Sequence, residues 1–319
     1  MDRKSIYRQY CEAAGDNVPL FQQYWWMETV CKGKEWDVAL AMKGDKVEGA
    51  MPFLLRRRWG LTYILQPQLT QYSGPHYCYP DQLSENERVG FEHRVGRELL
   101  RQLDDYKPIY VLQHFSTQVS NWLPFYWDGF KQTTRYTYRI NDIGDTERLF
   151  ACFDRDERQK KITRLAATTE VRFDMSAADF ARFHIAYWRS KGEQDLLSES
   201  FIARVCEESI RRGHGVIASL HDQEGRLVAA RFVVYDSREA YSLMSALEPT
   251  CYRNGYTETL VWGVLQWLST KTKVFDFEGS MDEGIEHFYR SFGAVQTPYF
   301  EVSRLRRRWF GLVLRLRGV

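Results

Sequence analysis

Two strand-and-turn patterns occur in the chain, one in each half. Residues 37–41 and 44–50 contain two strand-like runs joined at a glycine, and residues 215–220 and 225–230 repeat this pattern with a longer turn. Short apolar runs around a glycine turn predict antiparallel β-hairpins. We therefore expect one hairpin in each half of the molecule.

Helical patterns flank both hairpins. Apolar residues recur at helical spacing in residues 84–104, after the first hairpin, and in residues 260–268, after the second. A helical stretch with a similar aromatic signature precedes each hairpin, formed by Phe21, Tyr24 and Trp25 in the first half and by Phe183, Tyr187 and Trp188 in the second. This weak duplication predicts an α/β (α+β) fold of two tandem domains, each a mixed, mostly antiparallel sheet flanked by helices.

A charged helical segment, residues 145–165, separates the two copies. It predicts domains at residues 1–145 and 146–303, followed by a tail at residues 304–319. The basic residues of this segment are Arg155, Arg158, Lys160, Lys161 and Arg164. Such a run is either a solvated helix face or a surface that faces an anion.

Composition narrows the class of protein. A chain of 319 residues with 44% hydrophobic content can bury the cores of about two domains. Its net charge of +2 gives no support to a dedicated nucleic-acid-binding protein. Its six cysteines form no C-x-x-C pair, so neither a zinc site nor a disulfide scaffold is indicated. The polar N-terminus lacks the apolar core of a signal peptide, and no apolar run approaches the roughly 18 residues of a membrane span, so we expect a cytoplasmic protein.

The most informative segment is residues 275–280 followed by residues 284–293. It predicts a buried strand, a polar turn and a short helix that ends at a glycine. Ser280 and Glu283 have the spacing of a capping box at the start of this helix. Glu278 directly follows the apolar strand, where a packed strand would normally hide no charge. That carboxylate is therefore either part of the cap or a functional group in a cleft.

The order of helix, hairpin, strand, helix and strand, present twice, resembles two GNAT N-acyltransferase domains in tandem. The ending FDFEGSMDEGIEHFYRSFGAVQTPYF and the sequence LTQYSGP at residues 69–75 resemble the Fem-type and acetyltransferase-6 branch of this superfamily. The resemblance spans nearly the whole chain. It implies transfer of an acyl group to an acceptor, usually an amine, on a scaffold that serves several chemistries.

The resemblance also implies a donor site in the second half. Acetyl-CoA or another acyl-CoA would be the co-substrate, with no permanently bound cofactor and no metal. The strand of residues 240–246, which includes Ser245, would offer its backbone to the donor. A loop of free N–H groups before a helix would hold the pyrophosphate, and it would consist of Arg253, Asn254, Gly255 and Tyr256. The match of this loop is degenerate, because Tyr252 and Thr257 replace the usual residues, and Gly255 also fits an ordinary turn.

Acyl transfer to an amine needs a base for the ammonium proton, and a departing thiolate benefits from a general acid. Glu278 is the expected base and Tyr289 the expected acid, with His287 as an alternative base. Fem-type peptidyltransferases have a Phe-Lys pair where this chain has Phe288 and Tyr289, so Arg290 replaces that cation only if it turns inward. This departure favours a thioester donor over a charged tRNA.

We assign donor chemistry to the second half, which alone retains the glycine loop and the Glu278 segment. The first half would then shape the acceptor site, with Tyr72, Ser73 and Gly74 at the domain cleft, although Ser-Gly-Pro is also an ordinary turn. Trp188 is a candidate aromatic wall of the substrate site, and Arg231 a candidate anion contact.

The tail of residues 304–319 contains six arginines and no acid, with apolar residues at helical spacing. This pattern predicts a basic amphipathic helix. Such a helix would bind an anionic membrane surface, dock on the protein's own body, or contact tRNA or another polyanion. If it binds lipid, the protein would be peripheral on the inner face of the membrane.

Three functions fit this sequence. The first is an N-acyltransferase, with acetyl-CoA as the expected donor, that modifies an amine of a cell-envelope or sugar precursor. The second is a Fem-type aminoacyl-tRNA-dependent peptidyltransferase acting on a peptidoglycan precursor, for which an inward-facing cation near Phe288 would be the sign. The third is a non-catalytic, membrane-associated scaffold.

Overall fold

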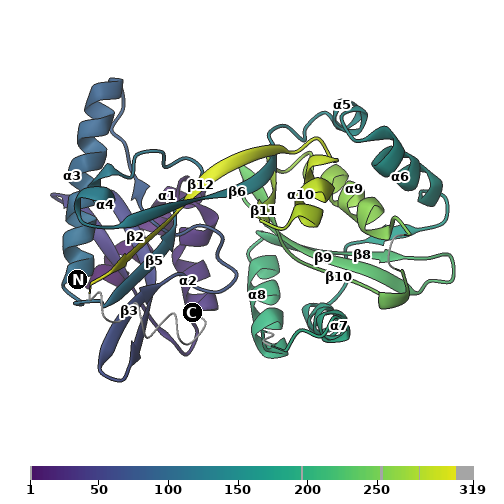
Figure 1. Ribbon diagram of the computed structural model, residues 1–319, viewed down its shortest axis with the longest axis horizontal. Coiled ribbons are helices and arrows are strands. Elements are labelled where there is room, and N and C mark those ends of the chain that lie inside the picture. Colours follow the sequence, from purple (N-terminus) through teal and green to yellow (C-terminus); the bar gives the residue numbers. More distant parts are fainter. Residues whose placement is uncertain (1, 195–196, 252–253, 280, 307–319) are drawn as a thin grey trace. The chain divides into compact units, whose positions relative to one another are not determined.

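A computed structural model describes residues 2–194, 197–251, 254–279 and 281–306 (Figure 1). The chain divides into two compact units: unit 1 is Met1–Arg135 with Pro298–Val319, and unit 2 is Tyr136–Thr297. The chain therefore enters unit 2 once and returns to unit 1 at its end. Residues 136–145, which the sequence analysis assigned to the first domain, fold with unit 2.

Unit 1 is built on a mixed sheet in which the strands follow the order β1-β2-β3-β5-β12, with β4 beside β2. Its strands are β1 (Glu35–Lys43), β2 (Lys46–Arg58), β3 (Leu61–Leu65), β4 (His76–Tyr77), β5 (Tyr110–His114) and β12 (Val295–Leu305). Its helices are α1 (Arg3–Ala14), α2 (Tyr24–Val30), α3 (Glu85–Asp104) and α4 (Leu123–Trp127). Of these neighbours, β3 and β5 are parallel, and the other pairs in the described register are antiparallel.

Helix α3 covers one face of the unit 1 sheet. It begins in a complete capping box between Ser84 and Glu87. Its approach to β2 requires a glycine, because a Cβ at Gly49 would lie 2.4 Å from Cγ1 of Val95. The helix was predicted over these residues from their apolar spacing, and Val89, one of the apolar residues in this range, is exposed.

The strands of unit 2 continue the same 12-stranded mixed sheet, in the order β6-β11-β10-β9-β8-β7. Its strands are β6 (Lys131–Ile140), β7 (Glu170–Arg172), β8 (Gly215–His221), β9 (Leu227–Tyr235), β10 (Glu239–Leu247) and β11 (Val274–Gly279). Its helices are α5 (Thr146–Ala151), α6 (Lys160–Leu165), α7 (Ala177–Ser190), α8 (Glu199–Arg211), α9 (Tyr256–Leu268) and α10 (Glu283–Arg290).

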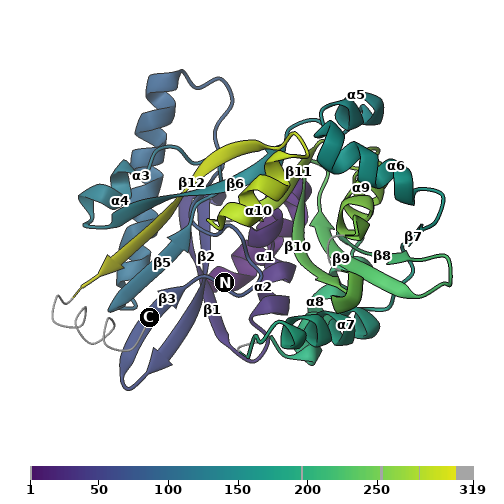
Figure 2. The ribbon, with the colours of Figure 1, turned by 45° about the vertical axis from the view of Figure 1, so that its right-hand side comes forward.

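Helices cover both faces of the unit 2 sheet (Figure 2). The apolar stripe of α9, which includes Val261 and Leu265, packs in one core with Ala229 and Val233 of β9. Helix α7 packs on the opposite face, where the ring of Phe180 lies 6.1 Å from that of Phe232 in β9. Because neighbouring residues of a strand point to opposite faces, β9 is apolar on both sides and its single charge, Arg231, is conspicuous.

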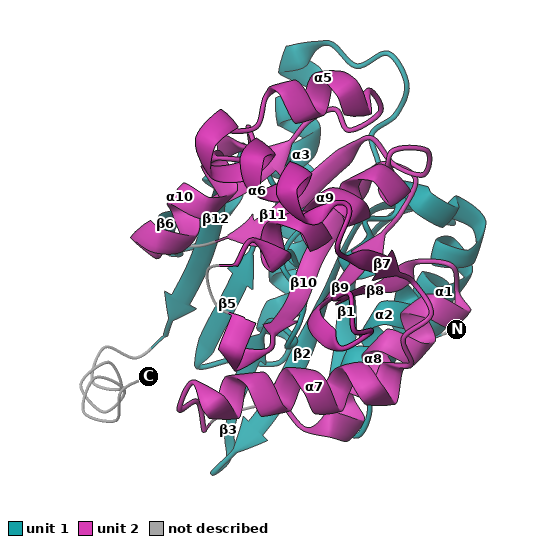
Figure 3. Ribbon diagram, turned by 90° about the vertical axis from the view of Figure 1, so that its right-hand side faces the viewer, with its two compact units in different colours: residues 1–135, 298–319 teal, residues 136–297 magenta. Residues whose placement is uncertain are grey.

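Two strands cross the boundary between the units (Figure 3). Strand β6 starts in unit 1 and pairs with β11 in unit 2, while β12 starts in unit 2 and pairs with β5 in unit 1. The sequence pattern contains no signal for this exchange, because a strand looks the same whichever sheet it joins.

Several predicted elements are confirmed, among them the hairpins β1–β2 and β8–β9 and the helix α9. The charged segment at 145–165 is not one helix, however. It is divided into α5, a π-helical turn (Arg155–Gln159) and α6. The division occurs where Phe153 enters the core and the Asp154 carboxylate accepts a hydrogen bond from Glu157 N at 2.7 Å, which starts a new turn.

Two predictions at helix ends are also corrected. The N-cap of α10 is Asp282, whose carboxylate accepts from Ile285 N at 3.0 Å, whereas Ser280 lies outside the described residues. Arg304 and Leu305 complete β12 instead of starting a helix, and residues 307–319 of the predicted tail helix lie outside the described part of the chain. Within the described residues, no helix has the length and apolar character needed to span a bilayer.

Candidate active site

Strands β10 and β11 separate in the middle of the unit 2 sheet. Their parallel ladder runs only from Glu239 and Val274 to Tyr241 and Asp276. At this point the register of β10 against β9 shifts beyond Ser242, and that of β11 against β6 shifts after Asp276. Such irregularities bend strands and end pairing, and they are common beside active sites. The carboxyl-terminal halves of the two strands are thus free of each other.

The end of β11 carries two carboxylates. Asp276 is fully buried and accepts hydrogen bonds from the Thr137 hydroxyl and from Glu278 N, the latter at 2.7 Å. Glu278 has φ 68°, a left-handed conformation that is uncommon outside glycine. The hydrogen bond from Glu278 N to Asp276 holds the backbone of this turn. A costly backbone conformation at a charged residue is a reason to suspect function.

Both carboxyl groups are more basic than usual. Burial raises the pKa of Asp276 to about 6, against the opposing effects of the Thr137 hydrogen bond and the Arg139 charge. Desolvation, followed by the charge of Asp276, raises the pKa of Glu278 well above its usual range. Two close carboxylates that have lost water do not readily ionise together. The pair is therefore able to hold a proton near neutral pH.

Tyr289 and Arg231 adjoin this pair. The Tyr289 ring stacks on Phe277 with centroids 4.7 Å apart. Its burial raises the pKa of the phenol to about 12, while the Arg231 charge lowers it and the charges of Glu278 and Asp276 raise it further. The side chain of Arg231 is 4% exposed; burial lowers its pKa, and its Nε has no hydrogen-bond partner among the described residues.

Arg231 reaches this position from β9. Its Nη1 donates to the hydroxyl of Ser242 on β10, and its backbone stands opposite Ser245 in the β9–β10 register. Glu278, Tyr289 and Arg231, which the sequence analysis named for three different roles, thus form one electrostatically connected group in unit 2. A buried guanidinium with an unused N–H can hold a developing negative charge.

The amino end of α9 is the second feature of unit 2. Gly255 is the N-cap, with φ 93°, and no side chain caps the helix. The N–H groups of Tyr256, Thr257 and Glu258 donate to no acceptor in the part of the chain that is described. Asn254 is exposed, and Arg253 lies outside the described residues. Uncapped N–H groups at the start of a long helix can hold an anionic group.

A buried ion-pair network anchors this helix end. The Glu258 carboxylate, in the first turn of α9, accepts from Arg158 Nη1 at 3.1 Å and from Lys161 Nζ at 3.0 Å. Nε of Arg158 donates to the Ser291 hydroxyl at 2.6 Å, and its guanidinium lies 4.7 Å from the ring centre of Phe288. Arg158 therefore ties α9 to α10, the helix that carries Tyr289. The charged segment of residues 145–165 therefore packs against the rest of the protein at Arg158 and Lys161, and it also faces water.

The residues predicted on the first half pack inside unit 1. Tyr72 and Ser73 are 3% and 1% exposed. The Ser73 hydroxyl donates to Pro52 O at 3.1 Å, and Gly74 N donates to Gln113 Oε1 at 3.3 Å. Gly74 has φ 78° and leaves no room for a side chain, since a Cβ would lie 2.4 Å from Phe115. These three residues lie in unit 1, whereas Glu278 lies in unit 2, and their part in an acceptor site stays a prediction.

Trp188 lies on α7, on the opposite face of the unit 2 sheet from α9. Its ring is 6.2 Å from that of His184, on the same helix, and this helix packs against β10. Burial lowers the pKa of His184 to about 4, so this imidazole is neutral at physiological pH. His184 and Trp188 thus lie behind the strand that the donor was expected to contact.

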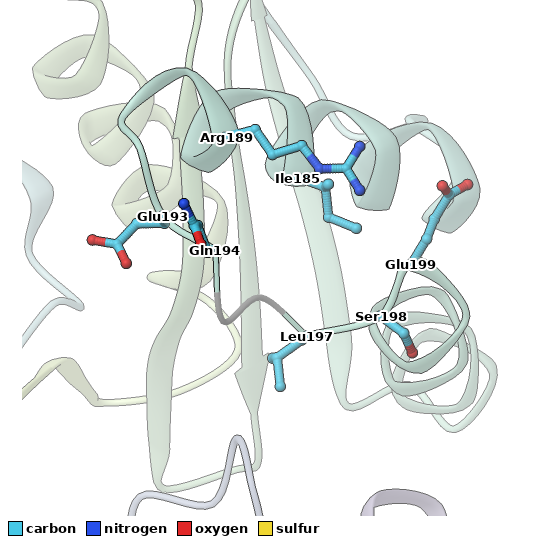
Figure 4. A pocket seen from close by; sticks show the side chains of 7 residues that line it. All are labelled: Ile185, Arg189, Glu193, Gln194, Leu197, Ser198 and Glu199. Atoms are coloured by element: carbon cyan, nitrogen blue, oxygen red, sulfur yellow. The ribbon is translucent and has the colours of Figure 1, made fainter. Parts of the chain in front are cut away.

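A recess of about 510 Å³ lies where α7 meets α8 (Figure 4). Arg189 lies across its upper side in this view, with Glu193 and Glu199 at either flank. The lining residues are Ile185, Arg189, Glu193, Gln194, Leu197, Ser198 and Glu199. Sequence reasoning missed this recess, because its residues belong to two helix ends and the connection between them.

Sequence reasoning also missed Asp276, Ser242 and Arg158. Asp276 sits between two buried phenylalanines, and that alternation was a usable signal, since a charge on a buried strand needs a reason. Ser242 gave no signal, because a serine is ordinary in a strand. Arg158 was counted as one charge in a run that would be either a solvated helix face or a surface facing an anion, whereas the structure buries it to 4% exposure.

Comparisons with known proteins agree with this architecture. Residues 155–288 match the model of a family described as an acetyltransferase (GNAT) domain. No curated protein matches the sequence significantly. The fold resembles that of FemX at 12% identity and a TM-score of 0.68, with 94% of each chain covered. It also resembles L-PGS from Bacillus licheniformis at 13% identity and a TM-score of 0.57, covering 91% of this chain and 95% of that one.

A third solved structure has a similar fold. It is the tandem GNAT protein from the clavulanic acid biosynthesis pathway, at 10% identity and a TM-score of 0.51, with 94% of each chain covered. At these identities the likeness concerns the fold. The chain therefore has the fold of these proteins, and its residues 155–288 are similar to an acetyltransferase (GNAT) domain.

Proposed function

We propose that unit 2 catalyses transfer of an acyl group, with acetyl-CoA as the first candidate donor, to an amine of a small cell-envelope or sugar precursor. The observation that carries this proposal is the group formed by Asp276, Glu278, Tyr289 and Arg231 at the place where β10 and β11 stop pairing. It combines a basic carboxylate, a phenol and a cation in a site with little water. GNAT domains typically take an acyl-CoA as co-substrate, and residues 155–288 match such a domain.

The proposed chemistry assigns one role to each group. Glu278, once ionised, accepts the proton of the acceptor ammonium, and its raised pKa makes it a stronger base. The amine nitrogen then bonds to the acyl carbon and gives up its second proton to solvent, and the carbon–sulfur bond of the thioester breaks. Tyr289 gives its proton to the departing thiolate, and the Arg231 charge stabilises the phenolate until a proton returns from solvent.

The amino end of α9 fits the phosphate part of such a donor. Its N-cap is a glycine, and its first N–H groups are unused by the described residues. Lys161 and Arg164 of α6 lie beside it, and Nη2 of Arg164 donates to Asn254 O at 3.0 Å. The Glu258 carboxylate in the same turn is held by Arg158 and Lys161, which offsets its repulsion of an anion.

Calorimetric titration of the full chain with acetyl-CoA tests the donor. Thr257→Glu places a negative charge at the second position of α9, where it suits the helix dipole but repels a pyrophosphate. Gln266→Glu makes the same charge change near the other end of α9, on an exposed residue, and is the matched control. We expect saturable binding that Thr257→Glu weakens at least tenfold and Gln266→Glu leaves unchanged. Equal affinity in all three proteins would reject this donor site.

A second function, Fem-type transfer of an amino acid from a charged tRNA, is favoured by one contact. The sign expected for it was an inward-facing cation near Phe288, and the buried Arg158 guanidinium lies 4.7 Å from that ring. The proposed carboxylate and phenol would serve this reaction in the same way, because the attacking group is again an amine. If acetyl-CoA fails to bind and aminoacyl-tRNA is consumed in the presence of an amine acceptor, this second function replaces the first.

A further inference from the structure

The turn between β2 and β3 has a bulky residue at a position where the backbone conformation favours a small one. Arg58 pairs with Leu61, so the hairpin loop consists of Trp59 and Gly60. Both residues have positive φ, 52° and 69°, as in a type I′ turn. Asparagine or glycine suits the first position of this turn, whereas a bulky side chain is strained there. Trp59 is nevertheless present, and its 69% exposure is the highest of any large apolar side chain in the described residues.

Arginines surround this tryptophan. Arg56 and Arg58 lie on one face of β2, because alternate residues of a strand share a face, and both are exposed. The Arg58 guanidinium lies 4.1 Å from the ring centre of Trp59. Arg57 points to the other face, where it pairs with Glu35. Within the described ranges, neither Arg56 nor Arg58 has an acidic partner.

The sheet topology brings other basic groups to the same edge of unit 1. Leu61 starts β3, and β3 runs parallel to β5, which pairs at its start with the last residue of β12, Leu305. The end of β2, the starts of β3 and β5, and the end of β12 therefore share one edge. Lys107, exposed in the turn before β5, lies at this edge, and the chain leaves it at Arg306.

The acids near this edge are already engaged. Asp104 pairs with Arg304 and with Arg306, the latter at 2.6 Å, and Asp105 pairs with Arg3. Arg56, Arg58 and Lys107 are thus left without acidic partners in the described residues, beside an exposed tryptophan. We call Arg56, Arg58, Trp59 and Lys107 the basic edge.

We propose that the basic edge of unit 1 binds an anionic lipid surface. Arginine and lysine are attracted to anionic headgroups, and tryptophan inserts at the level of those headgroups. The Trp59 side chain, which contacts the Arg58 guanidinium and is 69% exposed, would gain from burial in a lipid interface. Charge attraction and an apolar anchor at one edge together hold a protein far better than either does alone.

An anionic membrane fits these groups better than a nucleic acid does. A nucleic acid would also be attracted by the charges of the basic edge. The exposed tryptophan, however, stands at a hairpin turn and not in a groove that could stack bases. This inference does not depend on the proposed acyl transfer, since unit 1 carries the edge and binding is measured without turnover.

Co-sedimentation of the full chain with vesicles tests the proposal. One set of vesicles is pure phosphatidylcholine, and the other has about a third of its lipid replaced by phosphatidylglycerol. We expect binding only to the anionic vesicles. The double variant Arg56→Gln/Arg58→Gln should weaken this binding roughly 25-fold, from about fivefold for each arginine. The double variant Lys43→Gln/Lys46→Gln removes the same charge from exposed residues at the opposite hairpin of β2 and should leave binding unchanged.

Trp59→Asn separates folding from binding. Asparagine tolerates the left-handed conformation, so this variant should melt at the same or a higher temperature than the parent. Its affinity for anionic vesicles should nevertheless fall roughly tenfold, because the apolar anchor is lost. Unchanged vesicle binding by Trp59→Asn, or equal losses in the two double variants, would overturn the proposal. Absence of vesicle binding, together with arginine-dependent retention of total tRNA on a filter, would assign the edge to nucleic acid instead.

Discussion

Both units of this protein bury carboxylates, but they surround them with different groups. In unit 1 the carboxylate of Glu48, 5% exposed, accepts a hydrogen bond from Arg94 Nη1 at 2.6 Å. In unit 2 Asp276 is fully buried and accepts from the Thr137 hydroxyl and a backbone N–H, while Nε of Arg139 lies 3.8 Å from its other oxygen. The first carboxylate has a close cation, and the second has mainly neutral donors.

This difference appears in the acidity of the groups. The Arg94 hydrogen bond lowers the pKa of Glu48, whereas burial raises the pKa of Asp276 and of Glu278. A carboxylate that is made more acidic stabilises the folded state, and one that is made more basic costs stability when it ionises. The comparison indicates that unit 1 uses its buried charge for packing, and that unit 2 retains its charges at a cost that function would justify.

Glu278→Gln should have the largest effect on activity of the substitutions proposed for unit 2. If Glu278 is the base, acyl transfer to an amine acceptor should fall by about 10²- to 10⁴-fold. The melting temperature should stay constant or rise, because glutamine is nearly isosteric and brings no ionised group into a desolvated site. Initial rates of CoA release, with thermal unfolding in parallel, measure both effects. Wild-type activity in this variant would exclude Glu278 as the base.

Glu48→Gln is the matched control in unit 1. Activity per folded molecule should be unchanged. Stability should fall by about 1–2 kcal/mol, since a charged hydrogen bond is lost while Arg94, more than half exposed, can turn to water. A large loss of activity in this variant would mean that the distinction between the two units is wrong.

Tyr289→Phe should have the next largest effect. The ring would keep its stacking on Phe277, so folding should be preserved, while the proton donor to the leaving group is lost. We expect a fall in kcat of about 100-fold, at the low end for acid–base groups because a thiolate leaves readily. A donor with a better leaving group should recover part of this loss. A rate that is independent of the leaving group would contradict the role of an acid.

The sequence predicted most of the elements and named three residues of this candidate site, but it did not predict how these residues come together. Glu278 was recognisable because a charge directly follows a buried strand. Tyr289 was recognisable because a phenol lies on the short helix after that strand. Asp276 and Ser242 acquire meaning only from the break in the β10–β11 ladder, which depends on bulges that a strand pattern does not encode. Arg158 was hidden because burial of a charged helix face depends on a partner distant in sequence, here Glu258.

Asp276→Asn tests the raised pKa of this buried carboxyl group through the pH dependence of stability. The pKa of Asp276 is about 6 in the folded protein and 3.8 as the ordinary value, so the folded state binds this proton more tightly than the unfolded chain. The group therefore favours folding most below pH 3.8, and this contribution, up to about 3 kcal/mol, is lost as the pH rises through 6. Denaturant unfolding at several pH values should show a flatter profile between pH 4 and 6 in Asp276→Asn. An unchanged profile would mean that other interactions of Asp276 offset its burial, so that its pKa is not raised.

Ser73→Ala should have the smallest effect, and it decides what the first half contributes. The Ser73 hydroxyl donates to Pro52 O inside unit 1, so its loss should cost about 1 kcal/mol of stability and leave the KM for the acceptor unchanged. Urea unfolding and steady-state kinetics measure the two quantities in one preparation. A rise in KM without a change in kcat would instead support the sequence-based expectation that Tyr72, Ser73 and Gly74 contact the acceptor. In that case a residue 1% exposed in unit 1 would have to become accessible when substrate binds, and burial alone would no longer separate structural from functional groups in the two units.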